Sequence, residues 1–316
     1  MIRAMTPKWR TGLQRSLPVG VSLLVLIWLL HGVDLGSVAA AVTGRVAAVM
    51  IPALVGFCAV TLWLEAITIH RLVAHPPPSF GLWTAARIKC ASYLPGLIHY
   101  TLGLGGLAVL LRRRTGLSLG ESLGLVLLIS SVDLIVVLTA ASASAAVIGA
   151  EASGVRTGLV VFAIAALVLG LLVLRAPGSL GALDRVRALS IFEGLRRVSI
   201  PRLAELFTLR VFFSACFVAG CASAFAAFDI AAPPARLVSG IMLVALVAAL
   251  PIAVSGLGTS QAAFVYLFSD VAPAERLLAM SLVLSFGIIA MRAAMGLCFA
   301  RELTREALQD ARIASA

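Results

Sequence analysis

The chain has 316 residues, of which 61% are hydrophobic and only 12% charged, and its mean hydropathy is +1.08. Because soluble domains carry about a quarter charged residues, this composition excludes an ordinary soluble domain. The net charge of +11 comes almost wholly from arginines that lie between apolar runs. Such residues in membrane proteins set orientation and contact anionic headgroups, so we expect no nucleic-acid partner.

Runs of mostly apolar residues, most of them long enough for a membrane helix, follow one another along the whole chain. They cover residues 17–31, 46–69, 91–111, 120–148, 157–174, 208–228, 237–269 and 277–300. The first run follows a basic N-terminus, which is typical of a cleaved signal peptide or of a retained first helix. The many later runs favour the retained helix. The expected fold class is therefore all-α, with one integral membrane domain over residues 1–316.

The longest polar stretch, residues 175–207, separates the fifth and sixth runs. Within it, apolar residues recur at helical spacing among arginines, a pattern typical of an amphipathic helix on a membrane surface. These apolar residues are Leu183, Val186, Leu189, Phe192 and Leu195. We expect this stretch to be a cytoplasmic connector.

Basic residues are concentrated at a few places, and this distribution predicts the topology. Twenty of the 25 lie in five groups: Arg3, Lys8, Arg10 and Arg15; Arg71, Arg87 and Lys89; Arg112, Arg113 and Arg114; the seven arginines of residues 175–210; and Arg301, Arg305 and Arg312. Since cytoplasmic loops carry the excess of Lys and Arg, all five groups are expected inside, with both termini cytoplasmic.

Two runs then cannot be simple spans. Run 91–111 has cytoplasmic groups on both sides, so it is predicted to be a re-entrant hairpin, kinked at Pro95–Gly96 or at Gly103, Gly105 and Gly106. Run 237–269 is too long for one span and short for two, and both its flanks are poor in basic residues. We predict a second hairpin there, entering from the opposite face.

The expected architecture is about six full transmembrane helices and two re-entrant hairpins. Residues 46–148 and 208–300 form two units of opposite orientation, and each hairpin has Leu-Pro ahead of Gly-Leu-Gly. Inverted repeats with broken helices near the midplane build the substrate site of many transporters. The alternative is that Pro and Gly are simply common in membrane helices.

The predicted hairpins supply most of the candidate site residues. In the second, amides freed beside Pro251 would begin a half-helix that favours an anion such as a lipid phosphate. These residues are Ser255, Gly256, Gly258, Thr259 and Ser260, with Gln261 and Ser255 as neutral hydrogen-bonding groups. In the first hairpin, the polar candidates are His99 and Tyr100, although a lone histidine is more often a packing residue.

Three ionisable residues fall inside predicted spans, where charge is costly and therefore indicates a function or a paired charge. They are Glu65, Asp133 and Arg292. Asp133 and Arg292 occupy corresponding spans of the two units, so an ion pair between them is expected, with a structural or a functional role. Glu65 lies within two turns of the cytoplasmic end and could instead snorkel. Arg112, Arg113 and Arg114 are expected to contact headgroups.

The sequence has no Gly-rich phosphate loop with Lys and no H-E-x-x-H, and no spacing in it implies a Ser/His/Asp set. The five cysteines lie in or beside apolar segments without a C-x-x-C, as packing thiols do. We therefore expect no enzymatic activity, no catalytic residue, no metal and no cofactor.

Two stretches carry a family resemblance. "LPIAVSGLGTSQAAFVYLFSDVAPAERLLAMSLVLSFGIIAMRAAMGL" and "YLPG" followed by "LLRRRTGLSLGESLGLVLLISSVDLIVVL" resemble the lysylphosphatidylglycerol synthetase transmembrane region, also called flippase-like integral membrane proteins. By position, the resemblance carries over to Pro95, Gly96, Asp133, Pro251, Gly256 and Gly258. Gln261 stands where the family has an acid, and the acid and arginine that usually follow the first Pro-Gly are replaced by Leu97, Ile98, His99 and Tyr100.

The resemblance implies a lipid-moving module. In relatives this region moves an aminoacylated phospholipid between leaflets, and a separate soluble domain makes that lipid. Only a short tail follows the last apolar run, so we expect the synthetase activity to be absent. The expected function is a phospholipid or glycolipid flippase of the bacterial inner membrane, with a headgroup slot between the hairpins.

The expected partners are membrane lipids, anionic or glycosylated, and a lipid-modifying enzyme. Two alternatives stay open. One is a non-transporting scaffold for a glycosyltransferase or lipid-synthesis enzyme, and the other is a small-solute transporter.

Overall fold

The computed structural model describes residues 43–73, 76–147, 189–249 and 258–314, together with the single positions 40, 165 and 169. All the regular elements in these ranges are α-helices, which confirms the predicted all-α class. The predicted runs 17–31 and 157–174 lie outside the described residues, and so do Pro251, Ser255 and Gly256 of the second predicted hairpin.

Four of the helices are long and apolar enough to cross a membrane, which confirms a polytopic membrane protein. They are α3 (Gly44–Leu72), α6 (Leu119–Val147), α10 (Ile200–Ala227) and α13 (Ala274–Ala314), the last apolar as far as Phe299. Large apolar side chains such as Phe212 and Phe286 are more than half exposed on them, as expected where helices face lipid rather than water.

A two-helix hairpin occupies the first predicted hairpin region. It consists of α4 (Leu82–Ile98) and α5 (Tyr100–Thr115), and the chain between them is extended at His99 (φ −159°, ψ 137°). The break is therefore not at the predicted glycines or at Pro95–Gly96, because Pro95 is accommodated within α4 and Gly103, Gly105 and Gly106 lie within α5. His99 begins α5 because its Nδ1 accepts a hydrogen bond from the backbone N–H of Thr101.

Gly96 and Gly103 let the two arms of this hairpin approach each other closely. A Cβ on Gly103 would lie 2.8 Å from the Cα of Gly96, closer than any side chain tolerates. The arms, α4 and α5, have 17 and 16 residues. At a helical rise of about 1.5 Å per residue, neither arm reaches the hydrocarbon thickness of about 30 Å. Re-entry of this hairpin through one membrane face stays a prediction.

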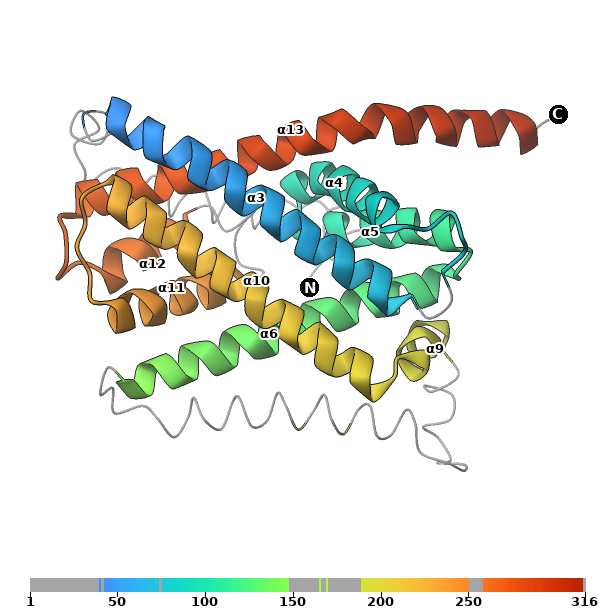
Figure 1. The fold of residues 1–316 in the computed structure, drawn as a ribbon, viewed down its shortest axis with the longest axis horizontal. Coiled ribbons are helices and arrows are strands. Elements are labelled where there is room, and N and C mark those ends of the chain that lie inside the picture. The colour runs from blue at the N-terminus through green and yellow to red at the C-terminus, as the bar shows by residue number, and fades with distance from the viewer. Residues whose placement is uncertain are drawn as a thin grey trace, which may run out of the picture.

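The second predicted hairpin region contains α11 (Pro234–Ala249) and α12 (Thr259–Leu267), which pack against each other. Figure 1 shows α4 and α5 at one end of the molecule and α11 and α12 at the other, with α3 and α10 antiparallel between them. The first helix of each hairpin packs against the long helix that closes the other unit: α4 against α13, and α11 against α6. Two inverted units over 46–148 and 208–300 would produce this pattern.

The part of the connector that the structure describes is a short helix, α9 (Ser190–Arg197), packed on the start of α6. Gly120 and Gly124 of α6 lie directly beneath Ser190 and Ile191, with no room for a larger side chain. Small residues at i and i+4 on α6 thus create a groove that α9 fills. That this helix lies on the membrane surface stays a prediction.

The packed interior has two apolar clusters, and charged residues lie where they meet. The first half of α3, with Met50 and Leu54, belongs to the cluster that includes Phe225 and Phe268. Its other half, from Ala66 to Leu72, belongs to the cluster around α4, α5 and α6. The residues between these halves of α3 build the candidate site.

Candidate functional site

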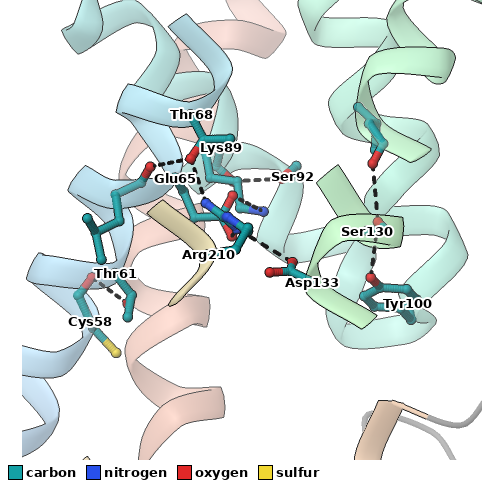
Figure 2. A network of polar contacts seen from close by, with 12 residues as sticks. Cys58, Thr61, Glu65, Thr68, Lys89, Ser92, Tyr100, Ser130, Asp133 and Arg210 are labelled. Atoms are coloured by element: carbon teal, nitrogen blue, oxygen red, sulfur yellow. Dashed lines mark hydrogen bonds and ion pairs between the residues drawn. The ribbon is translucent and has the colours of Figure 1, made fainter. Parts of the chain in front are cut away.

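Arg210 is the centre of a buried charge network, and its side chain has no exposed surface. Its Nη1 lies 3.0 Å from Glu65 Oε1 and 3.5 Å from Asp133 Oδ2, and its Nη2 donates a hydrogen bond of 2.7 Å to Thr68 Oγ1. Figure 2 shows the guanidinium between the α3 side chains and Asp133 of α6. One cation therefore joins two acids that come from different helices.

Glu65 is held by two cations. Its Oε1 pairs with Arg210, and its Oε2 lies 3.2 Å from Lys89 Nζ on α4. The Glu65 side chain is 8% exposed and that of Lys89 is 17% exposed. The alternative of a snorkelling Glu65 is thus wrong, because the carboxylate points into the helix bundle, where two bases balance its charge.

Asp133 is the accessible end of the network. Its side chain is 35% exposed, and the long contact with Arg210 Nη1 is its ion pair within the described chain. Ser130, one turn earlier on the same face of α6, lies 3.4 Å from the hydroxyl of Tyr100 at the start of α5. Figure 2 places Asp133, Ser130 and Tyr100 together on one side of Arg210. The tip of the first hairpin therefore lies beside the open end of the network.

The predicted ion pair between Asp133 and Arg292 is not formed. Asp133 pairs with Arg210, and the Arg292 guanidinium instead lies over the ring of Tyr93, 5.3 Å from its centroid. Lys89 Nζ lies 5.7 Å from the centroid of the same ring. The physical reason is that Arg210 of α10, fully inside the bundle, supplies a nearer cation for Asp133.

Sequence reasoning missed both Arg210 and Lys89 as site residues, because it counted them in the cytoplasmic groups. The predicted run that contains Arg210 starts at residue 208, whereas α10 starts at Ile200, nearly three turns before the arginine. Lys89 likewise lies two turns inside α4, which begins at Leu82. Two sequence signals could have revealed these helix starts. They are Ser199 and Pro201, ahead of Arg210, and Gly81, ahead of Lys89.

The second hairpin region contributes a buried amide rather than a charge. Gln261 of α12 is fully buried; its Oε1 accepts a hydrogen bond from Gly258 N–H, and its Nε2 donates one to Ser285 Oγ on α13. Ser260 Oγ also contacts the Gln261 Oε1 atom. The Gly258 amide, which was predicted to be free to bind an anion, instead donates its hydrogen bond to Gln261. Thr259 is the first residue of α12.

The three consecutive arginines lie apart from the network, in the last turn of α5. Arg112 and Arg113 are exposed there. A helix C-terminus favours positive charge, so this position stabilises the helix and places the two exposed side chains where headgroups would lie.

The part of the chain that the structure describes contains no group of three or more His, Cys, Asp or Glu placed to hold a metal ion. What the network can do is hold a charged or polar ligand within the membrane. It gathers Glu65, Lys89, Asp133, Arg210 and Arg292 from α3, α4, α6, α10 and α13.

Fold and site together define a polytopic α-helical membrane protein with charged side chains buried between its long helices. Residues 16–296 match the family described as the lysylphosphatidylglycerol synthase TM region, and the chain belongs to this family. The resemblance found from the sequence motifs is thereby confirmed. No curated protein and no solved structure matches the chain significantly. The family links this membrane protein to the synthesis or movement of lipids.

Proposed function

We propose that the protein moves a membrane lipid between the leaflets of a bacterial inner membrane. The headgroup would pass along Asp133 and the tip of the first hairpin, while the acyl chains remain in the surrounding lipid. The observation that carries this proposal is the charge network, which is centred on the buried Arg210 and reaches the partly exposed Asp133, close to Ser130 and Tyr100.

The composition of the network supports a transport role over a purely structural one. The pairs that Glu65 forms with Arg210 and Lys89 are closed within the helix bundle, as structural ion pairs would be. Asp133 adds a second acid that is held by a single long contact and remains partly exposed. Because polar groups facing a cavity inside a membrane protein usually mark substrate pathways, Asp133 is the group that we assign to the headgroup.

Charge at the two ends of the helix bundle supports the proposed orientation. The basic group Arg112–Arg114 lies at the end of the molecule formed by the first hairpin (Figure 1). At the other end, Arg45 and Arg236 are each neutralised by an aspartate, Asp229 and Asp270. The end with the surplus of arginine would face the cytoplasm, as would both termini.

A reconstitution experiment tests the proposal. Purified protein is inserted into vesicles that contain a fluorescent phospholipid or glycolipid, and a membrane-impermeant quencher then reports how fast inner-leaflet label reaches the outside. We expect protein-containing vesicles to lose inner-leaflet fluorescence faster than protein-free vesicles for at least one headgroup class.

The same experiment separates the alternatives. Equal rates with and without protein, over anionic, zwitterionic and glycosylated lipids, would contradict the proposal and favour a scaffold that acts through a partner enzyme. Uptake of a small solute without lipid movement would also contradict it, because the polar pathway would then serve a water-soluble substrate.

A further inference from the structure

The network carries more positive than negative charge. Its acids are Glu65 and Asp133, and its bases are Lys89, Arg210 and Arg292. Within the described ranges Arg292 has no carboxylate at ion-pair distance, and its recorded partner is the face of Tyr93. A surplus of one positive charge at membrane depth is costly unless an anion balances it.

The position of Arg292 is built into the packing of α13 on α4. Gly296, one turn after Arg292 on the same face of α13, has no side chain, and a Cβ there would lie 2.8 Å from Leu94 Cγ and 3.2 Å from the Cys90 carbonyl oxygen. The missing side chain lets α13 approach α4 closely, so that Arg292 reaches the ring of Tyr93. An arginine fixed in this way holds its guanidinium against Tyr93 of α4.

Tyr93 also brings a second cation to the same place. Lys89 lies one turn before Tyr93 on α4, and its Nζ is 5.7 Å from the ring centroid, compared with 5.3 Å for Arg292 Cζ. Lys89 has an acid partner in Glu65, which it shares with Arg210, whereas Arg292 has none in the described chain. The two cations beside one ring define a subsite, which we call the Tyr93 subsite: Lys89, Tyr93 and Arg292.

We propose that the Tyr93 subsite binds the phosphodiester of a phospholipid. The guanidinium of Arg292 matches phosphate oxygens in geometry, and Lys89 adds a point charge. A phosphodiester carries one negative charge, which balances the surplus of one, whereas free phosphate at neutral pH is a mixture of singly and doubly charged forms. One step of this inference rests on the proposed function, namely that the lipid bound here is also the lipid that is transported.

Binding rather than transport tests the subsite, so its failure and that of the proposed function are distinguishable. Detergent-solubilised protein is titrated with phosphatidylglycerol, with diacylglycerol of the same chains and with inorganic phosphate, and bound lipid is counted by native mass spectrometry. We expect Arg292→Gln to weaken phosphatidylglycerol binding at least tenfold and Arg292→Lys to retain most of it.

The matched control is Arg276→Gln, which removes the same charge from an exposed position on the same helix α13 and should leave binding unchanged. If Arg292→Gln cannot be purified in folded form, Tyr93→Leu provides a second test. It keeps every charge but removes the ring that positions both cations, and we expect a loss of threefold or more.

Several outcomes would overturn the inference. They are unchanged phosphatidylglycerol binding in Arg292→Gln or, where that variant does not fold, in Tyr93→Leu; equally tight binding of diacylglycerol; and displacement of the lipid by millimolar phosphate. Lost binding in Arg292→Gln with unchanged binding in Arg276→Gln would support it, whether or not the protein moves lipids.

Discussion

The Arg210 guanidinium contacts several charged and polar groups, although a single carboxylate would be enough to neutralise it. Glu65, Asp133 and Thr68 all contact its guanidinium, and the ring of Phe213 lies 5.1 Å from its Cζ atom. A buried ion pair can contribute little net stability, yet removal of one partner leaves an uncompensated buried charge. Arg210 is therefore expected to be a residue whose loss destabilises the whole bundle.

Replacement of Arg210 by Met should lower the free energy of unfolding by about 3–5 kcal/mol, because Glu65 and Asp133 lose their shared cation. The measurement is the thermal midpoint of the detergent-solubilised protein. Adding Glu65→Gln to Arg210→Met should restore part of the loss.

Arg45→Met is the control, since Arg45 is 66% exposed in its pair with Asp229, and exposed pairs contribute about 0–1 kcal/mol. Equal losses in Arg210→Met and Arg45→Met would contradict this interpretation.

At the scale of single residues, the sequence predicted that Glu65 and Asp133 lie within membrane helices, but it did not predict their partners. Asp133 and Glu65 stand out because each is an acid within a long apolar run. Arg210 and Lys89 do not stand out, because each lies near the edge of a run, where basic residues are common. Only the true helix starts, at Ile200 and Leu82, place them inside the bundle.

The first hairpin is the element in which a single methyl group should have the clearest effect. Gly103→Ala places a Cβ 2.8 Å from the backbone of Gly96, so α4 and α5 must separate. Gly105→Ala, two residues later on the same helix, meets nothing within 4 Å. It should stabilise α5 by up to about 1 kcal/mol through helix propensity.

The measurement is the thermal midpoint of the two variants in one detergent. We expect Gly103→Ala to fall below wild type and Gly105→Ala to stay level with it or rise above it. If Gly103→Ala were as stable as Gly105→Ala, the close approach of the hairpin arms would be wrong.

The contact between α9 and α6 gives a second prediction at the scale of elements. Gly124→Leu would fill the space that Ile191 and Leu195 occupy, so α9 should be displaced from α6. Trypsin should then cleave faster after Arg196, which is exposed in α9. Leu127→Phe, which adds bulk to an exposed position on α6, should leave that rate unchanged. Equal cleavage rates in wild type and Gly124→Leu would contradict the packing.

Element boundaries show why part of the fold was predictable. The turn between α5 and α6 can be derived from residue chemistry: Gly116 is left-handed (φ 74°) and ends α5, and Ser118 with Glu121 forms a capping box at the start of α6. The break in the first hairpin could not be derived in this way. Pro95 and three glycines all disfavour a helix, and only the packing of the arms decides that the break falls at His99.

At the scale of the whole molecule, ion pairs join α3 to α10, or to the turn that directly follows it, at both ends of the bundle. Arg45 pairs with Asp229 at one end, and Arg71 pairs with Glu205 at the other. A two-fold rotation that exchanges α3 and α10 would place one ion pair on the other, with the positions of the base and the acid interchanged. Apolar runs along the chain correctly predicted the four long apolar helices in sequence order. The contacts between the two units depend on residues far apart in sequence, which no local pattern encodes.

Topology can be tested at two exposed positions near opposite ends. In a background without native cysteines, Tyr266→Cys on α12, a position that is 82% exposed, should react with a membrane-impermeant thiol reagent added outside the cell. Arg113→Cys on α5 should react only after the cells are permeabilised, because arginine-rich ends face the cytoplasm. The reverse pattern of labelling would contradict the proposed orientation.

We propose above all that Asp133 contacts the lipid headgroup while it crosses the membrane, and one comparison tests this role most directly. The rate of transbilayer lipid movement is measured for wild type, Asp133→Asn and Asp270→Asn in the same vesicles. Asp133→Asn removes the partly exposed carboxylate of the network, and Asp270→Asn removes a surface carboxylate that is paired with Arg236. We predict a rate at least tenfold lower for Asp133→Asn, with Asp270→Asn close to wild type; equal rates in all three proteins would contradict the claim.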